Sequence, residues 1–238
     1  MQTILCIESG TDVCSVALSK DGKLISLRES TQGRQHASNL ALYVDEILES
    51  NNIKAEDLDA VALSEGPGSY TGLRIGTSLA KGLCFATDKN LVAVGSLLSM
   101  AAVAMEDFEA GLLGDVDPSE YLLCPMIDAR RMEVYTQLFD SQMNPLTEVE
   151  AIVVDENLFS DIREKTGKKL LIFGDGAQKC EEVIPSDIFT RIEVIPSARG
   201  LISAASKAIE NSDFKDVAYF EPFYLKDFII KKSNKKIF

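Results

Sequence analysis

Histidine and paired cysteines are scarce in this chain of 238 residues, and each scarcity excludes a class of chemistry. His36 is the single histidine, so a zinc site of the H-E-x-x-H type is excluded, and a Ser-His-Asp triad would depend on that one residue. The five cysteines are scattered and form no C-x-x-C pair, which argues against a disulfide framework and a thiolate zinc site. Acidic residues are too common for any one to stand out as a magnesium ligand. We therefore expect no zinc site, no catalytic triad and no bound cofactor, and a magnesium site built from carboxylates alone is the one metal site left open.

Long apolar runs are also absent from the sequence. No run approaches the roughly 20 residues of a membrane helix, and the N-terminal stretch MQTILCIESG has no basic segment before its short apolar run. We expect neither a membrane span nor a signal peptide. Together with the unpaired cysteines, this favours a cytoplasmic protein.

Acidic residues outnumber basic ones by 37 to 24 and give the chain a net charge of −13. Proteins bind nucleic acid mainly through Lys and Arg, so this chain is expected to be a poor RNA or DNA binder on its own. The exception is a cluster of lysines near the C-terminus: Lys226, Lys231, Lys232, Lys235 and Lys236. This cluster is either a solvated terminus or a basic handle that touches RNA held by a partner.

The hydrophobic pattern alternates between strands and helices, which is typical of an α/β layer fold. Asp21-Gly22 lies at the centre of an alternating stretch and predicts a tight hairpin. In the first half we expect strands at 3–9, 14–20, 23–30, 59–65 and 90–96, and helices at 36–52, 71–87 and 96–108. The second half opens with a strand at 121–128 and two strands joined by a turn at Asn144-Pro145. It continues with helices at 157–167 and 200–212 and strands at 169–177 and 189–198.

Two related halves follow from this order. Residues 108–118 are rich in Gly, Asp and Pro and are expected to link an N-terminal subdomain at 1–107 to a C-terminal subdomain at 119–238. Two βββαβα subdomains, the second of them reduced, resemble the actin, Hsp70 and sugar-kinase superfamily. That resemblance implies the fold, and function must be argued from the sites.

The glycine-rich stretch EGPGSYTGLRIG, at 65–76, invites a phosphate-binding interpretation that its spacing excludes. A P-loop requires G-x-x-x-x-G-K-[ST], and no Lys-Ser or Lys-Thr follows here. A dinucleotide fingerprint requires G-x-G-x-x-G, and Gly72 stands one residue out of step with Gly66 and Gly68. Small residues instead recur at Gly72, Gly76 and Ala80. Glycine inside a helix costs about 0.5–1 kcal/mol relative to alanine, so this ridge needs a packing reason, either within the fold or against a partner.

An actin-like cleft for ATP would lie between the first turns of the two halves. The candidate residues of this degenerate nucleotide cleft are Glu8, Ser9, Gly10, Asp128, Gly174 and Gly176. After Asp128 the turn reads Ala129, Arg130 and Arg131, where a glycine would let phosphate approach. The cleft is therefore expected to be eroded.

Six blocks occur in the order and spacing of the bacterial TsaB family, also called YeaZ, which the chain resembles over nearly its whole length. They are ILCIESGTDVCSVAL, GPGSYTGLRIG, IDARRMEVY, FGDGA, PSA and PFYLK. Glu8 and Lys226 stand where this family usually has Asp and Arg, and both keep the sign of the charge.

The resemblance implies a noncatalytic scaffold that pairs with TsaD, the subunit that transfers a threonylcarbamoyl group to the adenosine beside the tRNA anticodon. TsaE, a P-loop ATPase, would join the complex, and tRNA would be met only through it. Isolated copies would have the same face available for a homodimer. The expected partner interface lies on two helices of the N-terminal subdomain: Leu40, Tyr43, Val44, Ile47, Gly72, Leu73, Gly76, Ala80 and Leu83. The alternative is an ATP-dependent phosphotransferase or ATPase with a working cleft.

Overall fold

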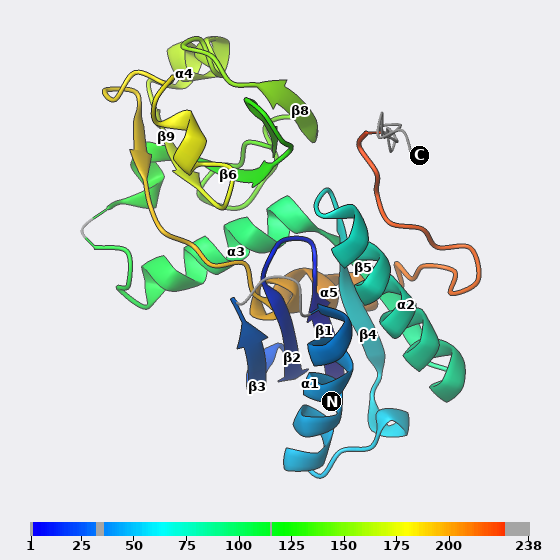
Figure 1. Ribbon diagram of the computed structural model, residues 1–238. Helices are drawn as coiled ribbons and strands as arrows, with labels where there is room; N and C mark the ends of the chain where they lie inside the picture. The colour runs from blue at the N-terminus through cyan, green and yellow to red at the C-terminus, as the bar shows by residue number, and fades with distance from the viewer. Residues whose placement is uncertain (1, 32–35, 115, 227–238) are drawn as a thin grey trace, which may run out of the picture.

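Two sheets of matching topology organise the chain in the computed structural model, which describes residues 2–31, 36–114 and 116–226 (Figure 1). The lysines at 231, 232, 235 and 236 lie outside the described residues, so the basic tail stays a prediction. Among the described residues, no helix combines the length and apolar composition that crossing a bilayer requires.

The first sheet forms as the alternation predicts. Its strands in spatial order are β3 (Lys23–Ser30), β2 (Cys14–Lys20), β1 (Thr3–Glu8), β4 (Ala60–Gly66) and β5 (Asn90–Gly95). The β2–β3 hairpin turns at Asp21 and Gly22, which both have positive φ, as a two-residue hairpin requires. The Gly66–Pro67 peptide bond that ends β4 is cis.

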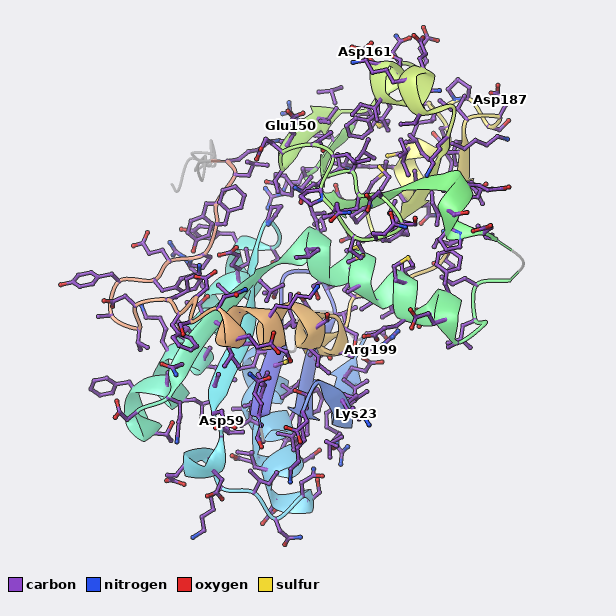
Figure 2. The ribbon with its side chains drawn as sticks, turned by 180° about the vertical axis from the view of Figure 1, so that it is seen from behind. Lys23, Asp59, Glu150, Asp161, Asp187 and Arg199 are labelled. Carbon is purple, nitrogen blue, oxygen red and sulfur yellow. The ribbon has the colours of Figure 1, made fainter. Side chains whose placement is uncertain are left out.

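Both faces of this sheet are buried because helices cover each of them. Helices α1 (His36–Ser50) and α2 (Tyr70–Thr87) pack on the face that includes Leu5 and Ile7. The opposite face, with Ile4 and Cys6, is covered by the 3-10 turn Ala198–Leu201 and helix α5 (Ile202–Glu210) (Figures 1 and 2). Alternate residues of one strand thus enter two different cores.

The second sheet repeats the first with shorter connections. Its strands in spatial order are β10 (Phe189–Arg191), β9 (Lys169–Phe173), β6 (Tyr121–Asp128), β7 (Glu133–Thr136) and β8 (Glu150–Val153). In each sheet the first three strands of the lobe run antiparallel to one another and the next two add in parallel. Helix α4 (Ser160–Thr166) has 7 residues where α1 has 15, which confirms a reduced second copy of an actin-like α/β unit.

Two segments differ from the expected pattern. Residues 137–149 form a loop with an isolated bridge between Phe139 and Pro145, so the second and third strands are not joined directly at Asn144-Pro145. Strand β10 is only three residues long.

Helix α3 (Ser96–Glu109) and the C-terminal segment connect the lobes. α3 leaves the first sheet and packs its apolar side on the second sheet, through Leu123, Leu171 and Phe173 (Figure 1). After β10 the chain returns to the first lobe, where Ala198, Leu201 and Ala205 are completely buried. The part beyond Ser197, which the sequence analysis placed in the C-terminal subdomain, therefore completes the core of the N-terminal one.

Candidate partner surface

The glycine-rich turn between β4 and α2 packs on the protein's own backbone. Ser69 N donates to Gly10 O at 2.6 Å, and a Cβ added at Gly68 would lie less than 3.0 Å from the same carbonyl. The Ser69 hydroxyl caps α2 by accepting from Gly72 N at 3.3 Å. The turn thus brings two strand ends together, and the Gly72 amide at the start of the helix has its partner within the turn itself.

The ridge of small residues on α2 has its packing reason inside the fold. Gly72 and Gly76 are buried, and a Cβ at either would lie less than 3.0 Å from Ser9, meeting its carbonyl oxygen or its hydroxyl respectively. Ala80 and Cys84 continue the same face into the core beneath the first sheet. Of the two interpretations of the ridge, internal packing is correct.

This packing corrects the prediction for most of the residues expected at the partner interface. Leu40, Val44, Ile47 and Leu73 are each 3% exposed or less, because they form the apolar face that α1 and α2 turn toward the sheet. Gly72, Gly76 and Ala80 lie on that face as well. Only Tyr43 and Leu83 are half-buried and accessible at the surface. That a partner binds these two helices stays a prediction, but most of the residues named for it lie on the face that packs against the sheet.

The solvent side of the same helices carries large apolar groups that sequence reasoning missed. Phe85 on α2 is 87% exposed and Leu42 on α1 is 51% exposed. Gly82 lies inside α2 with no atom within 4 Å of an added Cβ, so no contact in the described residues explains this glycine. We call Leu42, Tyr43, Ile75, Leu79, Gly82 and Phe85 the outer α1–α2 face. The sequence could have indicated this face, because Gly82 and Phe85 fall outside the helical spacing of the buried residues of α2.

The cleft residues expected in the first lobe make hydrogen bonds within the protein. Glu8 is buried and its Oε1 accepts from Gly10 N at 2.7 Å and from Ser64 Oγ at 3.0 Å. Ser9 N donates to Ser64 Oγ at 3.3 Å. Burial raises the pKa of Glu8, although the hydrogen bonds from Gly10, Ser64 and Ser9 act to lower it. This carboxylate holds the β1–β2 turn in place.

The second half of the expected nucleotide cleft is likewise closed by the protein itself. The Lys179 ammonium forms an ion pair with Asp128 and donates to Glu133 O at 2.6 Å. Partial burial acts to raise the pKa of Asp128, but the hydrogen bonds from Lys179 and Arg130 N lower it overall. A Cβ at Gly174 would overlap Met126 O, and one at Gly176 would lie 3.0 Å from Ile127 C.

These two glycines therefore allow β9 to approach the end of β6, and they have no spare space for a ligand. Arg130 and Arg131 adopt positive φ at the turn that follows Asp128. This is the conformation that glycine adopts most easily, and long cationic side chains occupy it here.

Metal and thiol chemistry gain no support from the described part of the chain. No group of three or more His, Cys, Asp or Glu side chains there is arranged to hold a metal ion. All five cysteines are buried and free. Burial raises the pKa of Cys6 and Cys124 to about 12, and that of Cys84 and Cys180 to about 11, which makes these thiols poor nucleophiles.

Comparison with known proteins places these features in a family. The family model described as "TsaD: tRNA N6-adenosine threonylcarbamoyltransferase" matches residues 26–230. A relative from Haemophilus influenzae, named tRNA threonylcarbamoyladenosine biosynthesis protein TsaB, is 35% identical over 56% of this chain and 52% of its own length. The protein of the same name from Escherichia coli is 28% identical over 94% of both chains.

The fold has a counterpart among solved structures. YeaZ from Pseudomonas aeruginosa is 24% identical and superposes with a TM-score of 0.79, covering 94% of this chain and all of that one. The family match spans most of the sequence, and the relative from Escherichia coli aligns over 94% of it. The chain therefore belongs to the family described as TsaD, tRNA N6-adenosine threonylcarbamoyltransferase, and among its members to the TsaB (YeaZ) group.

Proposed function

We propose that this chain acts in the biosynthesis of threonylcarbamoyladenosine in tRNA as a noncatalytic subunit that pairs with a TsaD-like transferase. The names of the relatives support the pathway. The noncatalytic role is supported by the residues of the expected nucleotide cleft, since Glu8, Asp128 and Gly174 are engaged in internal contacts. A subunit built in this way contributes a surface in place of a reaction centre.

The observation that carries the proposal is the outer α1–α2 face. Phe85 leaves nearly its whole ring in water, and burying such a ring against a partner removes more than 100 Å² of apolar surface. Gly82 would let a partner helix approach closely, which accounts for a glycine that has no contact in the described residues. Aromatic residues at the centre of an interface typically dominate its binding energy.

The other subunits follow from the same role. With a net charge of −13 the chain would meet tRNA only through its partner, since the surface repels a polyanion. A TsaE-like P-loop ATPase would supply the nucleotide chemistry that the closed turns of this chain do not. In the absence of the transferase, two copies would pair through the same outer face.

Two variants of the full chain test the surface against a matched control. Phe85→Ala removes the exposed ring, and Gly82→Leu blocks close approach. Ser203→Leu makes the same kind of change at an exposed position of α5 and serves as the control. Each is titrated calorimetrically with the purified TsaD-like subunit, and each variant's fold is checked by circular dichroism.

We expect Phe85→Ala to weaken binding by about 30-fold, the value for a hot-spot loss of about 2 kcal/mol. Gly82→Leu is expected to weaken it at least as much, and Ser203→Leu to bind as the parent does. If both variants fold and bind with the affinity of the parent, the partner binds a different surface of the chain. Turnover of ATP by the isolated chain would contradict the noncatalytic role.

A further inference from the structure

The last described stretch of the chain, Lys215–Lys226, runs along the first lobe toward the second (Figure 1). It begins at the free edge of β5, where Lys215 N donates to Leu91 O at 2.8 Å. It then passes beside α2, whose Lys81 ammonium donates to Ala218 O at 3.1 Å and to Phe220 O at 2.9 Å. Backbone atoms of an irregular segment are thus held by regular elements at both points.

The middle of this stretch joins two motifs that are far apart in the sequence. Phe223 N donates to Glu65 O at 2.7 Å, and an added Cβ at Gly66 would lie only 2.6 Å from Phe223 O. One residue later, the Tyr224 hydroxyl accepts from Arg74 Nε at 3.1 Å, while the Arg74 guanidinium lies 4.0 Å from the centre of the Tyr70 ring. The GPGSYTGLRIG and PFYLK motifs are therefore two sides of one contact.

The end of the stretch reaches the second lobe. Lys226 forms an ion pair with Glu133 on β7, and its ammonium lies 5.6 Å from the centre of the Tyr135 ring. Both partners of the pair are 34% exposed, so the pair is partly shielded from water. Eleven residues after its start on β5, the stretch is anchored on the other sheet.

A separate connection joins the lobes through α3. This helix packs on the second sheet, and Arg199 fixes it to the first lobe through Glu106 and Asp107, each at 2.6 Å. In Figure 1, α3 and the C-terminal stretch lie on different sides of the region between the lobes. The return of the chain from β10 to Ala198 is a further connection, and the C-terminal stretch adds a contact that resists hinge motion between the lobes.

We propose that Lys215–Lys226 is a strap that holds the two lobes in one relative position, with the Lys226–Glu133 pair as its closing contact. Closure of two lobes around a bound ligand by a hinge motion is a common conformational change in kinases. In this chain the strap suppresses that motion and keeps α2, to which it is bonded, in a fixed position relative to the second lobe. Release of the closing contact frees the lobes to change their angle.

The test measures the distance between the lobes in the full chain. Glu56→Cys in the first lobe and Glu150→Cys on β8 carry spin labels, and pulsed dipolar spectroscopy gives the distance distribution. The buried native thiols remain unlabelled in the folded chain. In this background, Lys226→Glu replaces attraction to Glu133 by repulsion, and Lys226→Glu with Glu133→Lys restores an opposite pair. Lys20→Glu, an equal charge change on β2, is the control.

We expect one narrow distance population in the parent and the control, a shifted or second population in Lys226→Glu, and return to the parental distribution in the swapped pair. Lys226→Met is expected to lie between the parent and the reversal, and it serves if the reversal fails to fold. An unchanged distribution in folded Lys226→Glu would overturn the proposal. So would a shift that the swapped pair does not reverse.

Discussion

Gly72 and Gly82 lie on the same helix, and alanine is expected to have opposite effects at the two positions. At Gly72 the new Cβ would lie less than 3.0 Å from Ser9 O, a backbone atom that cannot rotate away. Overpacking of this kind lowers the free energy of unfolding by about 1–3 kcal/mol. The helix preference of alanine over glycine raises it by about 0.5–1 kcal/mol. Because the β1–β2 turn is also held by the Glu8 hydrogen bonds, the cost lies at the upper end. The net loss is about 2 kcal/mol, which lowers the melting temperature by about 4–8 °C for a chain of this size.

At Gly82 the new Cβ meets no atom within 4 Å. Only the helix preference acts there, so Gly82→Ala is expected to raise the free energy of unfolding by about 0.5–1 kcal/mol. Urea and thermal unfolding of both variants, followed by circular dichroism, measure the difference directly. Equal stability of Gly72→Ala and the parent would mean that the start of α2 does not press on Ser9. Destabilisation by Gly82→Ala would mean that this glycine has an internal role.

Three further variants test other parts of the fold. Ser69→Ala removes the cap of α2 and is expected to cost about 1 kcal/mol in urea unfolding, with Ser69→Asp retaining most of it. Arg199→Leu leaves Asp107 without its ion pair and is expected to cost about 1–2 kcal/mol, and no loss would remove this contact from the connection between α3 and the first lobe. Because burial raises the pKa of Glu8, the folded protein keeps this carboxyl protonated to a higher pH than the unfolded chain does. The free energy of unfolding therefore falls as the pH rises above 4.5, the usual pKa of a glutamate side chain. Glu8→Gln should remove that decline, and a stability difference that moves in the opposite direction between pH 4.5 and 7.5 would contradict the burial argument.

The sequence was most informative where one local pattern decides a structure. The Asp21-Gly22 pair predicted the hairpin because few other residues adopt positive φ twice in succession. The three opening strands and the helix at Leu40 followed from periodicity alone. The matching topology of the two sheets could be expected because the order of strands and helices repeats.

The site was harder to predict because exposure depends on elements that are distant in sequence. A stripe of small residues says that something approaches α2 closely, but it does not say whether Ser9 or a partner does so. The exposure of Phe85 could not be predicted, because a lone aromatic residue at a helix end is compatible with either burial or exposure. The contact of Tyr224 with Arg74 spans 150 residues and has no local signal.

The return of the C-terminal segment to the first lobe has a consequence for the growing chain. Ile4, Cys6, Ala62 and Val92 belong to the first part of the sequence, yet the residues that cover them come from 198–205. During synthesis from the N-terminus, this face of the sheet has no cover until the whole second lobe has left the ribosome.

The first lobe is thus the first to be made and the last to be finished. Long-range contacts of this kind slow folding and leave apolar surface exposed in the meantime. A ribosome-bound chain that stops before Ser197 should therefore expose the apolar face of this sheet to solvent. This is the stage of synthesis at which we expect chaperones to bind the chain most.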